Sequence, residues 1–175
     1  MPVITFLGGA RTVTGSKYLL DLDGSQVMVD CGLFQGERQL RDRNWQPVKV
    51  RADQLPAVVI THAHLDHCGY LPRLHSDGFE GEIHATSGTI ALASIILPDS
   101  AHLQEEEARF ANERGFSKHR PALPLYDAAA VDETLPLFRI LEHDQQREVV
   151  PGITASLSRA GHILGSSIAH IDLDG

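Results

Sequence analysis

Four residues with metal-binding side chains, His62, His64, Asp66 and His67, stand within a window of six residues. They follow the apolar run 57–60, which is short and rich in β-branched residues and is therefore predicted to be a buried strand. Alternate residues of an extended chain point to the same side, with Cα atoms roughly 6 to 7 Å apart, so His62 and His64 could share one Zn²⁺. Asp66 and His67 follow where a helix is predicted to begin, and this change of direction suits a second ion. The spacing predicts a two-metal hydrolase.

A polar loop in which histidines cluster without a function is the alternative interpretation. Buried imidazoles without partners would be costly, however, and a bound cation supplies such a partner. A metal-activated water also explains why the sequence needs no Ser-His-Asp or Cys-His arrangement for hydrolysis.

The composition is that of an ordinary globular domain, with 175 residues, 42% hydrophobic and 22% charged. We find no signal peptide and no apolar run near the roughly 18 residues needed to span a bilayer, so we expect no membrane partner and a cytoplasmic location. We expect the two cysteines, Cys31 and Cys68, to be small buried thiols rather than a disulfide. Cys68 directly follows His67 and is the alternative as a metal ligand.

The formal net charge of −8 argues against binding to nucleic acid, because phosphate binding normally requires a basic surface. Two divalent ions would offset part of this repulsion locally. Small basic groups occur at Arg38, Arg41 and Arg43 and at Lys118 with Arg120. Such groups are more often solvated surface than substrate contacts.

The order of predicted elements indicates an α/β (α+β) fold. Asp23-Gly24 is typical of a hairpin turn, and Asp127 is placed as the N-cap of a short helix. A long helix is predicted over 87–113, in which Pro98 should produce a kink or a split. The predicted strands are 3–7, 17–22, 26–29, 57–61, 81–85, 138–142, 153–158 and 168–173, and the further helices are 34–45 and 66–71, the second ended by Pro72. Strands interrupted by helices, after an initial hairpin, fit one half of an αββα sandwich.

Four segments of the chain together resemble a known protein family, and they occur in the same order as in that family. They are Phe6 to Ser16, Val29 to Gly36, Thr61 to Leu71 and Ala160 to Ser166, and they span nearly the whole chain. The segment around His62 looks like the signature of the metallo-β-lactamase superfamily. The other segments resemble its β-CASP nucleases, the group that contains the cleavage and polyadenylation endonuclease and related bacterial and archaeal ribonucleases.

The resemblance implies a ligand set. His62, His64 and His162 would hold one divalent ion, while Asp66 and His67 would hold a second and take part in catalysis. Zn²⁺ is preferred over Mn²⁺ or Fe²⁺ because of ligand softness. The implied activity is hydrolysis of RNA phosphodiesters by a hydroxide that two metal ions activate.

Two further segments have alternative interpretations. Asp30 ends a predicted buried strand, and the resemblance makes it an outer residue that orients the ligand loop; a turn-forming aspartate is the alternative. The glycine-containing segment 8–16 could cradle a phosphate with backbone amides, but it lacks the nucleotide-binding spacings and is otherwise a loop between strands. The remaining histidines show no ligand spacing and are expected to be structural or exposed.

The chain is expected to be the N-terminal portion of a metallo-β-lactamase domain over residues 1–175. In the family that it resembles, a bridging aspartate, the β-CASP domain and the rest of the sandwich with a later histidine come further along the chain, so we expect none of them within these residues. We therefore expect this chain to bind the first ion better than the second and to show little activity alone. The alternatives are a glyoxalase II-like thioesterase, a tRNA 3′-processing enzyme or a non-catalytic subunit of an RNA-processing complex. A homo-oligomer is compatible with the sequence.

Overall fold

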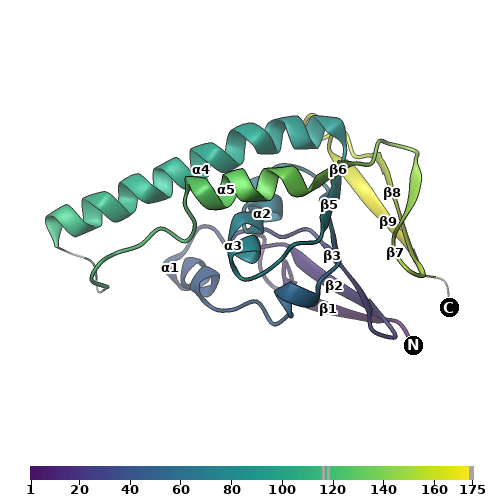
Figure 1. Cartoon of the computed structure of the whole chain (residues 1–175), viewed down its shortest axis with the longest axis horizontal. Coiled ribbons are helices and arrows are strands. Elements are labelled where there is room, and N and C mark those ends of the chain that lie inside the picture. The colour runs from purple at the N-terminus through teal and green to yellow at the C-terminus, as the bar shows by residue number, and fades with distance from the viewer. Residues whose placement is uncertain (116, 118, 174–175) are drawn as a thin grey trace.

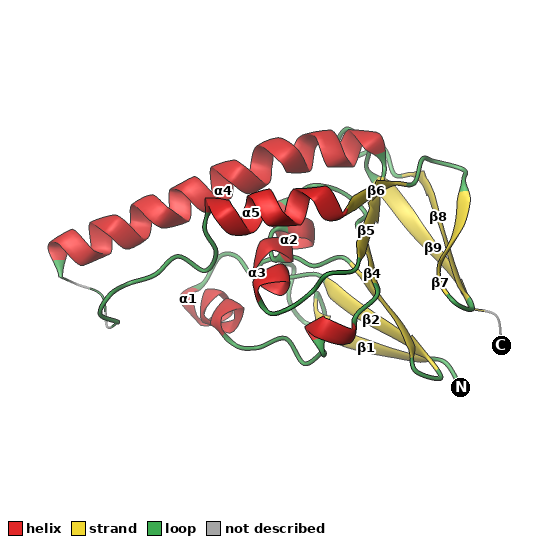
Figure 2. Cartoon of the chain, in the orientation of Figure 1, coloured by secondary structure: helices red, strands yellow, loops and turns green. Residues whose placement is uncertain are grey.

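The computed structural model describes residues 1–115, 117 and 119–173 and arranges them in three layers (Figure 1). The middle layer is a six-stranded sheet with the strand order β1-β2-β3-β4-β5-β6. Helices cover one face of this sheet, and a three-stranded sheet, β7-β8-β9, lies on the other (Figure 2). These layers confirm the predicted α/β (α+β) class.

The larger sheet begins antiparallel and becomes parallel after β3. Its strands are β1 (Val3–Gly8), β2 (Lys17–Leu22), β3 (Ser25–Val29), β4 (Ala57–Val59), β5 (Glu82–Ala85) and β6 (Phe138–Ile140). The smaller, antiparallel sheet contains β7 (Gln146–Val150), β8 (Ile153–Arg159) and β9 (Ser167–Leu173). The α-helices are α1 (Arg38–Arg41), α2 (Leu65–Cys68), α3 (Leu71–Ser76), α4 (Ser87–Arg114) and α5 (Ala128–Thr134), and the 3₁₀ turns are Asp42–Trp45, Ala52–Gln54 and Leu135–Leu137.

The turn between β2 and β3 has the predicted hairpin geometry. Asp23 and Gly24 both have positive φ angles, 50° and 97°, as a two-residue turn of type I′ requires. This turn pairs Leu22 with Ser25 and so fixes the register of β2 against β3.

Two hydrophobic cores lie on opposite faces of the larger sheet, because side chains alternate between the faces of a strand. On β4, Val58 faces the helices, while Ala57 and Val59 face the smaller sheet. The helical core includes Leu71, Leu74, Ala93, Leu97, Ala101 and Val131. The core between the two sheets includes Leu141, Val150, Ile153, Ala155 and Leu157. Strand β4 is therefore buried on both sides, which explains its continuous apolar sequence.

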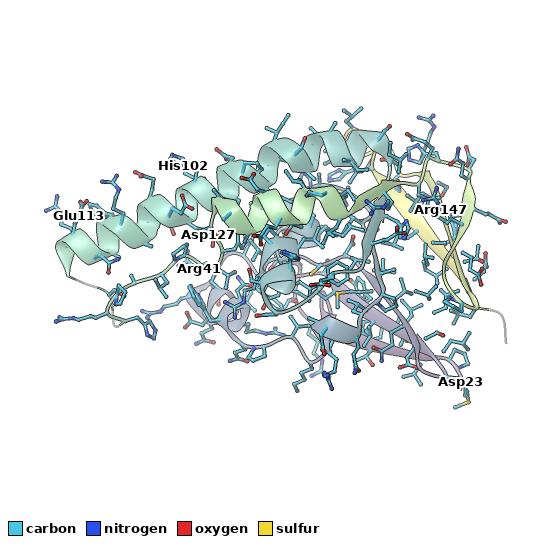
Figure 3. All side chains as sticks on the ribbon, in the orientation of Figure 1. Asp23, Arg41, His102, Glu113, Asp127 and Arg147 are labelled. Atoms are coloured by element: carbon cyan, nitrogen blue, oxygen red, sulfur yellow. The ribbon has the colours of Figure 1, made fainter. Side chains whose placement is uncertain are left out.

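Helix α4 is longer than predicted by one residue and is not split at Pro98. It begins after Thr86, whose side chain accepts a hydrogen bond from the Thr89 backbone, and it ends at Gly115 in the left-handed conformation. Leu97 and Ala101 are both buried against the helical core, so packing on both sides of Pro98 keeps the helix continuous. The outer side of α4 carries polar side chains such as His102 (Figure 3). Within the described residues, no helix is both long and apolar enough to cross a membrane.

Two other helix predictions were wrong in extent. The helix expected over 34–45 begins only at Arg38, because the backbone N–H and C=O of Phe34 both bond the side chain of Asn44. The helix expected over 66–71 ends at Cys68, and Pro72 stands in the first turn of the next helix, where its missing N–H costs nothing. Strand β7 was missed because its sequence is mostly polar and exposed. Lys118 lies outside the described residues.

Candidate metal centre

Three histidines from two loops converge at one edge of the molecule. His62 and His64 follow β4, and His162 lies in the loop between β8 and β9. His62 Nε2 is 3.2 Å from His64 Nδ1, and His162 Nε2 is also 3.2 Å from His64 Nδ1. One ligand nitrogen from each ring lies within 4.8 Å of the others. The predicted convergence of His62 and His64 is therefore present, and His162 joins them.

Two of the separations between these nitrogens fit a tetrahedral metal ion. Two nitrogen ligands bound at about 2.0–2.1 Å in a tetrahedron lie about 3.3 Å apart, close to the two separations of 3.2 Å. Hydrogen bonds alone do not explain them, because the Nδ1 of a neutral His64 carries either one proton or one lone pair and so cannot form a full hydrogen bond with both neighbours. Burial, with the charges of the neighbouring histidines, lowers the pKa of His62 to about 4, so its imidazole is neutral at pH 7.

A chain of hydrogen bonds orients the His62 ring. His62 Nδ1 lies 3.0 Å from the hydroxyl of Thr61, and this hydroxyl lies 3.0 Å from both carboxylate oxygens of Asp30. The carboxylate accepts from Thr61, so the Thr61 oxygen accepts the Nδ1 proton of His62. The lone pair of His62 is thereby left on Nε2, the nitrogen that faces His64. The role of Thr61 was not predicted, although this residue opens the histidine motif.

Asp66 and His67 form a second pair beside the three histidines. The His67 ring centroid is 4.0 Å from that of His62, and His67 Nε2 lies 3.7 Å from Asp66 Oδ2. His67 Nδ1 donates to Asp30 Oδ2 at 2.7 Å, which leaves Nε2 directed toward Asp66. Burial alone would lower the pKa of His67, but its hydrogen bond to Asp30 and the charges of Asp30 and Asp66 raise it overall.

Asp30 thus contacts both groups, directly at His67 and through Thr61 at His62. It is 2% exposed and has a φ of 58°, a conformation that a non-glycine residue rarely adopts. Its Oδ1 also accepts the backbone N–H of Thr61 at 2.8 Å. Asp30 therefore lies within hydrogen-bonding distance of both His67 and Thr61, and its role in orienting the ligands stays a prediction.

The backbone that carries Asp66 and His67 is held by two other segments. Cys31 N donates to His67 O at 2.7 Å, and Ser16 N donates to Asp66 O at 2.9 Å. Gly32 lies so close to this backbone that a Cβ atom added to it would be 1.6 Å from Asp66 O. A side chain at position 32 would therefore displace the segment that carries the second pair.

The loop that carries His162 is fixed by the start of α4. The hydroxyls of Thr86 and Thr89 both donate to Gly165 O, at 2.7 Å and 2.9 Å. Within the loop, the hydroxyl of Ser166 accepts the backbone N–H of His162 at 3.0 Å. The N-terminal turn of α4 therefore sets the position of the third histidine, and sequence spacing gave no sign of this.

Both cysteines are buried and unreactive in this environment. Burial raises the pKa of Cys31 to about 12 and also raises that of Cys68. Among the other histidines of the described residues, His143 lies 3.1 Å from the Ser167 hydroxyl and His170 lies 2.8 Å from the Ser158 hydroxyl. Within the described residues, the group His62, His64 and His162 is the one cluster with metal-binding geometry.

Comparisons with known proteins agree with this geometry. The chain is 34% identical over 167 residues to "Ribonuclease TTHA0252" of Thermus thermophilus, covering 95% of this chain and 34% of the relative. It is 29% identical over 170 residues to "Transcription termination factor FttA" of Methanocaldococcus jannaschii, covering 97% of this chain and 25% of the relative. The chain thus spans about a third and a quarter of the length of these relatives.

A solved structure shares the fold at lower sequence similarity. It is a mutant of a metallo-β-lactamase with the HARLDQ motif from Cronobacter sakazakii, with a TM-score of 0.55 and 20% identity, covering 99% of this chain and 58% of that one. The family model of the metallo-β-lactamase superfamily matches residues 11–152, which include β4 and the motif from His62 to His67. Because this match covers most of its length, the chain belongs to the metallo-β-lactamase superfamily.

Proposed function

We propose that this chain is the metal-binding part of a β-CASP nuclease, a metal-dependent phosphodiesterase that hydrolyses RNA. The observation that carries the proposal is the convergence of His62, His64 and His162 on one point, with Asp66 and His67 beside it. The ribonuclease and the termination factors among its relatives favour RNA over other substrates of the superfamily.

The residues have distinct tasks in this proposal. His62, His64 and His162 would hold one divalent ion, and Asp66 with His67 would contribute to a neighbouring one; imidazole and carboxylate ligands favour Zn²⁺. The bound ions would activate a water molecule and stabilise the charge on the phosphoryl oxygens. Asp30 and Thr61 keep a lone pair on the ligand nitrogens by holding the ring protons on Nδ1 of His62 and His67.

The chain offers three ligands to the first ion and two to the second, so the first should bind more tightly. Chelator-treated protein is titrated with Zn²⁺, and bound metal is measured by competition with a chromophoric chelator. We expect one tight ion per chain and a weaker second one. His64→Ala should abolish the tight site, whereas His102→Ala, an exposed histidine on α4, serves as the matched control. Two equally tight ions would contradict the proposed division of ligands.

The substrate class is tested with three compounds in parallel. The metal-loaded chain, and any longer polypeptide that contains it, is incubated with single-stranded RNA, a tRNA precursor and a glutathione thioester. The proposal expects cleavage of single-stranded RNA by the longer polypeptide, with little activity from the chain alone. Hydrolysis of the thioester without cleavage of RNA would refute it and favour the glyoxalase II-like alternative. The cytoplasmic location and a homo-oligomeric state stay predictions.

A further inference from the structure

A cavity of about 200 Å³ beside the start of β2 contains none of the candidate metal ligands. Three cationic side chains, Lys17, Arg43 and Lys49, line it, and its lining includes no carboxylate. The chain as a whole has 23 acidic against 15 basic residues, so this grouping runs against its general charge. Its remaining walls are mainly apolar and aromatic: Phe6, Leu7, Phe34, Pro47, Val48 and Tyr70, together with Gln46.

Lys17 is the deepest of the three cations and is 2% exposed. Its ammonium group donates to the backbone carbonyl of Gly32 and lies 4.8 Å and 4.5 Å from the ring centroids of Phe34 and Tyr70. These neighbours supply partial negative charge but no counter-ion. An ammonium has three donors, and the Gly32 carbonyl takes one of them. Burial, with a smaller contribution from the charge of Arg43, accordingly lowers the pKa of Lys17 to about 8.

Arg43 places a second cation on the same aromatic ring. Its guanidinium carbon is 3.9 Å from the ring centroid of Phe34. Arg43 and Lys49 are exposed at the mouth of the cavity, whereas Lys17 lies at its base. In the part of the chain that the structure describes, none of the three cations takes part in an ion pair. Placing like charges together without a counter-ion is costly, and a bound anion would remove that cost.

We propose that this cavity binds a phosphate group, with Lys17 at its base and Arg43 and Lys49 at its mouth. A phosphate suits this site because its oxygens can accept from an ammonium and from the planar fork of a guanidinium at once. The exposed ring of Phe6 and the rings of Phe34 and Tyr70 offer apolar surface to the sugar or base of a phosphate ester. The phosphate comes either from a free nucleotide or from the backbone of an RNA chain. The site is separate from the metal centre, so the proposal does not rest on the proposed catalytic function.

Chelator-treated protein is titrated with inorganic phosphate, adenosine 5′-monophosphate and a short single-stranded oligoribonucleotide with a 5′-hydroxyl. Removing metal ions prevents phosphate from binding at the histidine cluster. Calorimetry and ³¹P NMR measure binding, with chloride at matched ionic strength as the control anion. Tighter binding of the nucleotide than of the oligoribonucleotide identifies a free nucleotide as the source, and the opposite order identifies the RNA backbone.

Four variants test the residues. Lys17→Met and Arg43→Met each remove a charge-assisted hydrogen bond, so each should weaken phosphate binding roughly 10- to 100-fold. Lys49→Met should weaken it less. Arg114→Met is the matched control, because Arg114 also lies over a phenyl ring, that of Phe110, but on α4 outside the cavity. It should leave binding unchanged.

The test separates binding from a purely structural role of Lys17. Thermal unfolding of each variant checks its fold, and Arg43 and Lys49 are exposed, so their variants stay informative if Lys17→Met does not fold. The proposal is overturned if the wild-type chain binds no phosphate at tens of millimolar. It is equally overturned if Arg43→Met and Lys49→Met bind phosphate as the wild type does.

Discussion

Replacing Asp30 by asparagine tests how the candidate centre is oriented. Asp30 Oδ2 accepts from His67 Nδ1 at 2.7 Å, and Oδ1 accepts from the backbone and the hydroxyl of Thr61 at 2.8 Å and 3.0 Å. Asparagine has the same shape as aspartate, but an amide NH₂ group, which donates, replaces one of the two carboxylate oxygens. If its amide nitrogen faces His67, the ring proton must move from Nδ1 to Nε2, and the lone pair offered to a metal is lost. If it faces Thr61, the backbone N–H there loses its acceptor.

The expected loss follows from the number of bonds involved. Changing a residue that orients a metal ligand typically reduces metal affinity about 10- to 100-fold, and Asp30 orients ligands on both sides. We expect Asp30→Asn to weaken Zn²⁺ binding by at least that range while the chain still folds. Asp30→Ala should in addition destabilise the metal-free chain by about 1–3 kcal/mol, because it leaves the part-buried N–H of Thr61 without an acceptor.

Chelator competition measures the affinity, and urea unfolding of chelator-treated protein measures the stability. Asp53→Asn is a matched control, because Asp53 is an exposed carboxylate bound to Arg51. It should leave metal affinity unchanged. If Asp30→Asn binds Zn²⁺ as tightly as the wild type, the orienting role given to this carboxylate is wrong.

Three further changes probe other parts of the centre. Gly32→Ala should cost about 3 kcal/mol or more of folding free energy, measured by urea unfolding, because its Cβ would meet Asp66 O at 1.6 Å; a wild-type midpoint would contradict this. Gly165→Ala should lower Zn²⁺ affinity at least 10-fold in chelator competition, because φ is +75° and the new Cβ would lie 2.2 Å from Thr89 N. Burial lowers the pKa of His84 below its value near 6.5 in the unfolded chain. The contribution of His84 to the free energy of unfolding is therefore fully present above pH 6.5 and falls as the pH drops below that value. Unfolding of metal-free wild type and His84→Leu at pH 7.5 and 5.5 should show the weaker pH dependence in the variant, and parallel dependences would refute the assignment.

The histidine pair of the first motif was predictable because the necessary geometry is local. Two residues that are two apart after a buried strand point the same way, and the rings of His62 and His64 do meet. His162 is 98 residues from His64 in sequence, and only its place in a family motif indicated it. The contribution of Thr61 depends on which strand pairs with β4. The residues next to Thr61 in the sequence do not reveal that pairing.

The helices show the same division between local and distant causes. The N-cap at Asp127 was predicted from a local hydrogen bond, which the structure confirms at 2.9 Å from Ala130 N. The late start of the first helix has a tertiary cause, since Asn44 binds the backbone of Phe34 from ten residues away. Local patterns therefore identified the elements, while tertiary hydrogen bonds decided where some of them begin and end.

The candidate metal centre lies where the two sheets meet, and this position follows from strand order. The parallel pairing of β3 with β4 sets Val29 beside Val59, so the residues that follow these strands, Asp30 and Thr61, emerge together at the carboxyl ends. The third histidine comes from the other sheet, and Ser167 N at the start of β9 donates to Thr61 O at 2.9 Å. The ligand atoms are thus divided between two sheets, and their spacing depends on the packing of the core between those sheets. A sequence pattern can name such ligands, but only the packing of the two sheets brings their nitrogens to the separation that a metal ion requires.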